Sequence, residues 1–273
     1  GYPLFLDQLL RSASAGQHEL PATVRSLVLA RADRLSSQDH LALEAAAVLG
    51  QRTELAIVRC MLQDQSYEPD KLVATTLVRS DGIELEFAHA LFRDAIYEST
   101  LKSQRRAMHR AAAEWFSSRD LALHAEHLAA ADDERAPAAY LDAAEAERTA
   151  LRYESALTLA NKASAVAREP ILLHRTSVLL GELLLHLGRT HDALAAYREA
   201  LDFSIDQNGH GVAWFGIASA LRVMDRHEEA LDALERAESA LEETADAQMR
   251  ARVSTLRGNL CFPLGRFDAC LEA

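Results

Sequence analysis

Two histidines set three residues apart are the clearest candidates for metal chemistry in this sequence. His124 and His127, with Glu126 between them, would put two imidazoles on one face of a helix, as zinc ligands often are. No H-E-x-x-H pattern, third ligand nearby or C-x-x-C pair accompanies them. We therefore interpret them as surface or groove-lining histidines of a helical hairpin and predict no metal site. A zinc-dependent hydrolase that uses this pair is the alternative.

The sequence contains no motif for phosphate binding or for nucleophilic catalysis. A P-loop needs a glycine directly followed by lysine, and none of the three lysines follows a glycine. No G-x-S-x-G elbow presents a serine nucleophile. We predict a non-enzymatic segment with no catalytic residue and no cofactor of its own. The cysteines, three in number and without a C-x-x-C pair, indicate packing roles in a reduced, cytoplasmic setting: Cys60, Cys261 and Cys270.

The densest basic patch combines Arg105, Arg106 and Arg110. A DNA-binding regulator would need such a patch on a basic face, because phosphate contacts dominate nucleic-acid affinity. The chain has a net charge of −12, however, and residues 119–273 carry −10 of it. We therefore expect no nucleic-acid partner and a solvated helix face at the patch. Direct DNA binding through the first 118 residues is the alternative.

Composition indicates an all-α protein. Hydrophobic residues, mainly alanine and leucine, make up 49% of 273 residues, and aromatic residues only 6%. No apolar run reaches the roughly 18 residues of a membrane span. The chain starts without methionine or the basic segment of a signal peptide, so we expect a piece of a longer cytoplasmic protein.

Residues of matching type recur at offsets of 37, 37 and 40 along the second half of the chain. Each repeat places small residues where two helices of a hairpin would approach closely, and larger ones such as Tyr197 between hairpins. A turn position follows each first helix, and glycine suits the left-handed backbone there. The turn positions are Leu151, Gly188, Asp225 and Gly265; the small columns are Ala144, Gly181, Ala218 and Gly258, then Ala163, Ala200 and Ala237. Pro170 predicts a helix start, and Asn208-Gly209 a loop between hairpins.

This pattern resembles the tetratricopeptide repeat over roughly residues 134–273, including a tryptophan at Trp214. The resemblance implies an α-α superhelix whose first helices line a concave groove. An array that stops inside a hairpin at Ala273 is expected to continue. The groove would bind a protein or small-molecule effector through polar and aromatic side chains on successive first helices: Arg175, Glu182, Phe215, Arg222, Arg252 and Asn259, with Val178, Ser219 and Thr255.

The first 118 residues predict several short helices. Helices are expected at about 22–34, from Ser36-Ser37 to Leu49, from Thr53-Glu54 through Leu62, and near 70–78. The one strand-like segment is 83–87, after the turn Asp81-Gly82, and helices follow at about 89–100 and 102–117. Short helices followed by a small hairpin predict a winged-helix-like domain.

Four short blocks resemble the STAND-type signal-transduction ATPases, whose relatives include LuxR-type activators and multidomain proteins with an adenylate cyclase domain. The blocks are residues 1–10, 20–25, 43–50 and 87–97. The resemblance implies a switch protein with an upstream ATPase module that binds ATP or ADP and contacts this segment in cis. It also implies that Pro3 packs near the adenine and that His89 senses the nucleotide phosphates. Here the motif is Ala88-His89-Ala90, without the usual aspartate, so a histidine that caps or packs at a strand–helix junction is the alternative.

The sequence thus predicts an all-α chain with three parts: 1–19 as the end of an ATPase module, 20–118 as a winged-helix-like domain, and 119–273 as truncated tetratricopeptide-like repeats. Its expected function is a regulatory, partner-binding segment of a nucleotide-dependent signalling protein.

Overall fold

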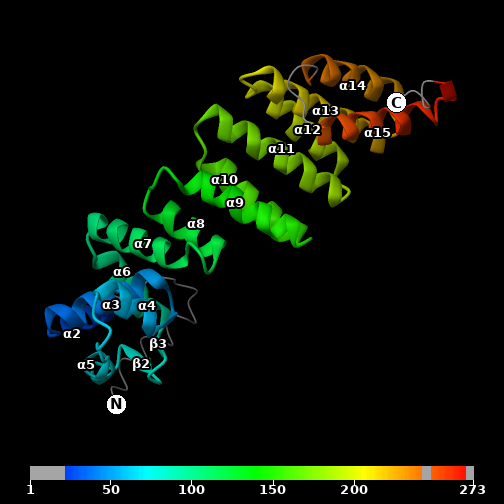
Figure 1. The fold of residues 1–273 in the computed structure, drawn as a ribbon. Helices are drawn as coiled ribbons and strands as arrows, with labels where there is room; N and C mark the ends of the chain where they lie inside the picture. Colours follow the sequence, from blue (N-terminus) through cyan, green and yellow to red (C-terminus); the bar gives the residue numbers. More distant parts are fainter. Residues whose placement is uncertain (1–21, 242–246, 269–273) are drawn as a thin grey trace. The chain divides into compact units, whose positions relative to one another are not determined.

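The computed structural model describes residues 22–241 and 247–268, which form two compact units (Figure 1). Unit 1 extends to Asp133, and unit 2 begins at Glu134. The described ranges contain fourteen helices and three short strands, so the predicted all-α class is confirmed. No helix of these ranges is long and apolar enough to cross a membrane.

Unit 1 begins with four helices, of which the second shows how the sequence sets its ends. Ser36 accepts a hydrogen bond from the backbone N–H of Asp39 and caps this helix, as predicted. Gly50, at φ 133°, ends it and donates to the Ala46 carbonyl. The four helices are α2 (Ala22–Ala32), α3 (Ser37–Leu49), α4 (Leu55–Leu62) and α5 (Asp70–Ala74).

Three antiparallel strands form one small sheet in unit 1, and a winged-helix-like domain stays a prediction. The strands are β1 (Arg52–Glu54), β2 (Val78–Ser80) and β3 (Glu84–Phe87), in the sheet order β1-β3-β2. The sequence predicted only the third. The helix start expected at 53–54 agrees with Glu54 as the N-cap of α4, although these residues also pair with β3. The helix end expected near 78 was wrong, because α5 ends at Ala74 and Val78 pairs with β3. Three-residue strands are too short to show a period-two pattern, so only the tertiary pairing reveals them.

Three further helices belong to unit 1: α6 (Ala90–Ser99), α7 (Lys102–Phe116) and α8 (Leu121–Ala130). The last packs on α7 through Ala125 and Leu128, both fully buried. By packing, this helix therefore goes with unit 1, although it follows the domain boundary that the sequence predicted at 118/119.

Unit 2 is a stack of helical hairpins (Figure 1). Each first helix packs against the second helix of its own hairpin and against its neighbours in the stack. The helices are α9 (Ala136–Thr149) with α10 (Tyr153–Val166), α11 (Pro170–His186) with α12 (Thr190–Asp202), α13 (Gln207–Val223) with α14 (His227–Leu241), and α15 (Ala247–Cys261). This is the tetratricopeptide-like α-α architecture that the repeat columns predicted.

All four predicted turn positions adopt the left-handed backbone. Gly188 and Gly265 have φ of 74° and 69°, while Leu151 and Asp225 have 59° and 57°. Leu151 and Asp225, which replace glycine, therefore adopt the same left-handed backbone, and the conformational strain is larger for leucine than for aspartate. Six of the seven residues predicted for the small columns are buried: Ala144, Gly181 and Ala218, and Ala163, Ala200 and Ala237. The seventh, Gly258 on α15, is only half-buried.

Helix starts in unit 2 follow one prediction and contradict another. Pro170 is the first residue of α11, as expected. The loop predicted at Asn208-Gly209 is wrong, because both residues lie in the first turn of α13. Asp206 caps that helix by accepting a hydrogen bond from the Gly209 N–H at 2.7 Å. This cap stabilises the helical conformation of Asn208-Gly209, a pair that by itself favours a turn.

Candidate ligand groove on the first helices of the hairpins

Two pockets of about 380 Å³ each lie on the first helices of the unit 2 hairpins. The α11–α13 pocket is lined by Glu145, Ile171, His174, Arg175, Val178, Leu179, Glu182, Ile205, Asp206, Asn208, Gly209 and Val212. The α13–α15 pocket is lined by Phe215, Ser219, Arg222, Gln248, Ala251, Arg252, Thr255, Leu256 and Asn259. We call the two pockets together the groove.

All of the groove residues predicted from sequence line one pocket or the other. Arg175 and Glu182 lie in the α11–α13 pocket. The other four lie in the α13–α15 pocket: Phe215, Arg222, Arg252 and Asn259. The repeat period explains this result, since residues at matching positions of successive first helices share one face of the stack. That they bind a partner stays a prediction.

Arg252 joins the two pockets. Its guanidinium nitrogen lies 3.7 Å from the Glu182 carboxylate, and its Cζ lies 4.8 Å from the centre of the Phe215 ring. One side chain of α15 therefore reaches both α11 and α13. Both charged groups are partly exposed, so this ion pair contributes at most about 1 kcal/mol and can be exchanged for contacts to a ligand.

The groove also contains charged groups that no described residue pairs with, and apolar side chains that stay exposed. Arg175 and Arg222 form no ion pair with any described residue. Ile171 and Ile205 line the same pocket as Arg175 and leave 49% and 64% of their surface exposed. Guanidinium donors next to exposed aliphatic side chains suit a ligand that presents both a carboxylate or carbonyl and an apolar group.

Tyr197 of α12 fixes the spacing of the helices behind the groove. Its ring fills the space that side chains at Gly181 and Gly216 would take: a Cβ at these glycines would lie 2.6 and 2.2 Å from ring atoms. Burial, together with the nearby charge of Glu182, raises the pKa of the phenol, while the charge of Arg252 opposes the rise. Sequence reasoning found Gly181 through the repeat, but Gly216 stands outside every repeat column and was missed.

His89 is the N-cap of α6. Its Nδ1 accepts a hydrogen bond from the Leu91 N–H at 3.2 Å, and its ring lies 5.8 Å from that of Phe92. The capping interpretation is thereby confirmed, and a role in nucleotide sensing stays a prediction. Pro3, the other residue implied by the family resemblance, lies outside the described residues.

His124 and His127 do not converge on one point. The Nδ1 of His124 is hydrogen-bonded to the Ala113 carbonyl at 2.8 Å. His127 is buried and instead meets His109, with 2.9 Å between the two Nδ1 atoms. This contradicts the surface or groove interpretation for His127, because α7 and α8 pack together on that side. Among the described residues, no group of three potential ligands could hold a metal ion.

The buried histidines form a chain with Tyr97. The Tyr97 hydroxyl is hydrogen-bonded to Nε2 of His109 at 3.0 Å, and the Nδ1 of His109 is hydrogen-bonded to the Nδ1 of His127 at 2.9 Å. Burial, His127 and two nearby arginines lower the pKa of His109 to about 4, and burial also lowers the pKa of His127.

The basic patch is engaged within unit 1. Arg105 donates to the Tyr97 carbonyl and lies over its ring, while Arg106 pairs with Asp132 and Arg110 with Asp133. Guanidinium groups held in this way are poorly placed to bind phosphates. Cys261 is buried, in keeping with a packing role, whereas Cys60 is exposed, and Cys270 lies outside the described residues.

Comparison with known proteins adds the following. A family profile described as tetratricopeptide repeat matches residues 174–204, which include most of α11 and all of α12. No curated protein matches the chain. The chain is similar to the crystal structure of a Signal Transduction ATPase with Numerous Domains (STAND) protein with a tetratricopeptide repeat sensor from Pyrococcus horikoshii, with a TM-score of 0.46 and 13% identity. That match covers 88% of this chain and 44% of the other, so the chain spans less than half of that protein's length. The segment from His174 to Ser204 is thus tetratricopeptide-like both in its sequence and in its hairpin structure.

Proposed function

We propose that unit 2 is the effector-binding arm of a regulatory protein and that the groove is its binding site. One observation carries this proposal: Arg252 links Glu182 on α11 to Phe215 on α13, so three successive first helices form one polar and aromatic surface. A ligand that displaces Glu182 from Arg252 would change the contacts between first helices, which is how binding could be communicated along the stack.

The effector is a protein segment or a small molecule with both an anionic or carbonyl group and an apolar group. The guanidinium groups of Arg175 and Arg222, which form no ion pair with a described residue, supply the polar contacts, and the exposed side chains of Ile171 and Ile205 the apolar ones. Two pockets of about 380 Å³ each are large enough for several residues of a peptide or for one metabolite.

The wider context follows from the STAND resemblance of the four sequence blocks. We propose that the chain is part of a cytoplasmic, nucleotide-dependent switch in which ATP or ADP binds an adjoining ATPase module and unit 1 contacts that module in cis. The capped α6 and the residue that caps it, His89, would then lie at the nucleotide-dependent contact. An output through a LuxR-type or adenylate cyclase domain is part of the same proposal.

A binding experiment on the full chain tests the groove. Peptide and metabolite libraries are screened by thermal shift, and each ligand found is titrated calorimetrically against the wild type, Arg222→Glu and Arg198→Glu. Arg198 is an exposed arginine of the second helix α12 and lines neither pocket. We expect Arg222→Glu to weaken binding by about tenfold or more, because a charge-assisted hydrogen bond becomes a repulsion, and Arg198→Glu to leave it unchanged. The proposal would be refuted if both variants weakened binding equally, or if no ligand bound the wild-type chain.

A further inference from the structure

A separate pocket of about 600 Å³ lies in unit 1 and has no part in the groove. It is formed by the end of α2 and the turn after it, the start of α3, and the end of α5. We call it the cationic pocket, after the three basic side chains that line it. Its lining residues are Arg31, Arg34, Leu35, Ser36, Asp39, Lys71, Ala74, Thr75 and Thr76.

The positive charges of this pocket are not neutralised by described residues. Arg34 and Lys71 are exposed and form no ion pair in the described part of the chain. Arg31 donates only to uncharged oxygens, the Thr75 carbonyl at 3.2 Å and the Thr76 hydroxyl at 2.8 Å. This contrasts with the patch on α7, where Arg106 is paired with a carboxylate. Three guanidinium or ammonium groups thus share one concave surface with their charges available.

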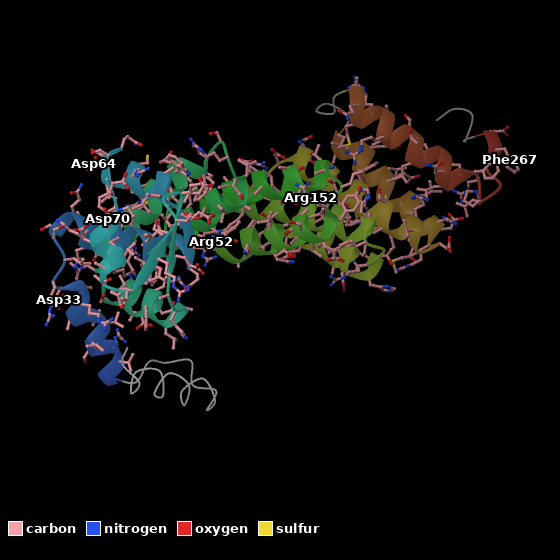
Figure 2. All side chains as sticks on the ribbon, turned by 90° about the horizontal axis from the view of Figure 1, so that it is seen from below. Asp33, Arg52, Asp64, Asp70, Arg152 and Phe267 are labelled. Carbon is pink, nitrogen blue, oxygen red and sulfur yellow. The ribbon has the colours of Figure 1, made fainter. Side chains whose placement is uncertain are left out.

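The one carboxylate that lines the pocket is already engaged. Asp39 is only 4% exposed, and it accepts hydrogen bonds from the Ser36 hydroxyl at 2.5 Å and the Tyr67 hydroxyl at 3.1 Å. The pocket therefore keeps a net positive charge of about two, from three cations and one anion. Figure 2 labels Asp33 just after α2, Asp70 at the start of α5 and Asp64 between α4 and α5, and none of the three lines the pocket.

The backbone at the rim of the pocket is strained. Thr76 has φ of 63°, a left-handed conformation that β-branched residues rarely adopt. Several hydrogen bonds hold this turn; among them, Arg31 donates to the Thr76 hydroxyl, and the Leu77 N–H donates to the Thr75 hydroxyl at 3.2 Å. The hydrogen bonds of Arg31 anchor its side chain at the pocket wall, and strained residues such as Thr76 cluster at ligand sites.

We propose that the cationic pocket binds a small anion with two or more phosphate groups. Three separate cations, with the hydroxyl group of Thr76 beside Arg31, match several phosphate oxygens at once. The hydroxyl groups of Ser36 and Thr75 already donate to Asp39 and to the Leu72 carbonyl. The volume exceeds the needs of a single phosphate, and the lining has no aromatic ring on which a base could stack. Recognition therefore depends on the phosphate groups and not on an attached base.

Calorimetric titration of the full chain at low ionic strength tests this proposal. The probes are tripolyphosphate, pyrophosphate and orthophosphate, and the proteins are the wild type, the double variant Arg34→Ala/Lys71→Ala, and Arg79→Ala. Arg79, on β2, is an exposed cation of the same unit that does not line the pocket and forms no ion pair with a described residue. Circular dichroism checks that each variant is folded, as expected for changes at exposed positions.

We expect affinity to fall from tripolyphosphate to orthophosphate and to fall with added salt. The double variant should bind tripolyphosphate at least about tenfold more weakly, because two charge-assisted contacts are lost, while Arg79→Ala should bind it as the wild type does. Three results would overturn the proposal: no binding of tripolyphosphate at millimolar concentration, an equal loss in the control variant, or tighter binding of duplex DNA that Arg79→Ala also weakens. None of these results depends on the groove of unit 2.

Discussion

Replacing Gly216 by alanine sets two physical effects of opposite sign against each other. Gly216 lies in the interior of α13, where alanine favours the helix by about 1 kcal/mol over glycine. The added Cβ would lie 2.2 Å from a ring atom of Tyr197, well inside van der Waals contact. The neighbouring atoms cannot yield easily, because the same ring fills the space beside Gly181.

The overlap should decide the sign. Forcing an extra methyl into a packed interior costs about 1–3 kcal/mol, and here the atom that it meets belongs to a buried ring, not to the mobile end of a side chain. The distance is so short that the upper part of this range applies. After the helical preference is subtracted, we expect Gly216→Ala to lower the free energy of unfolding by about 1–2 kcal/mol.

Urea unfolding followed by circular dichroism measures the effect, and Tyr197→Ala provides the control background. That change removes all three ring atoms nearest to the added Cβ, so alanine at 216 should be neutral or stabilising there. The difference between the two backgrounds should be about 1–2 kcal/mol of coupling. A stabilising Gly216→Ala in the wild-type background, or the same loss in both backgrounds, would refute the argument that Tyr197 sets the spacing of α11 and α13.

Three further predictions follow from local geometry. Leu151→Gly should stabilise unit 2 by about 0.5–1 kcal/mol in urea unfolding, because it removes left-handed strain at φ 59° from a side chain that is 71% exposed; a loss of stability would contradict this. Asp206→Ala should cost about 1 kcal/mol through loss of the α13 cap, whereas Asp206→Asn should retain most of it. Because His109 titrates at about 4 when folded but near 6.5 when unfolded, the unfolded state binds protons first as the pH falls. The free energy of unfolding should therefore drop by about 2 kcal/mol from pH 7.5 to 5, and by less in His109→Asn; an equal drop in both proteins would contradict the assignment.

The repeat hairpins illustrate what could be predicted from sequence. Matching side chains at a fixed period implied stacked helical hairpins, and the buried small columns and left-handed turns follow that period, even where Leu151 or Asp225 replaces glycine. The same period placed the predicted groove residues on one face. Local signals of this kind can be recognised in the sequence, since a helix cap or a turn depends on residues a few positions apart.

Other features depend on residues that are far apart in the sequence. The strands β1 and β2 exist because each pairs with β3, and neither is long enough to show a pattern of its own. His127 contacts His109 from another helix. Arg31 and Lys71 reach one pocket from α2 and α5, which are separated in the sequence by α3, β1 and α4. No periodicity links such positions.

The sequence by itself therefore determined the helical class, the hairpin repeat and the groove face, because each follows from spacing along one chain segment. Only the tertiary structure decided which charged side chains stay available to a ligand. Arg106 is paired with Asp132, whereas Arg34, Lys71 and Arg222 form no ion pair with a described residue. The free energy of a charged side chain depends on which partners folding brings near it, and that information lies in the packing of distant elements.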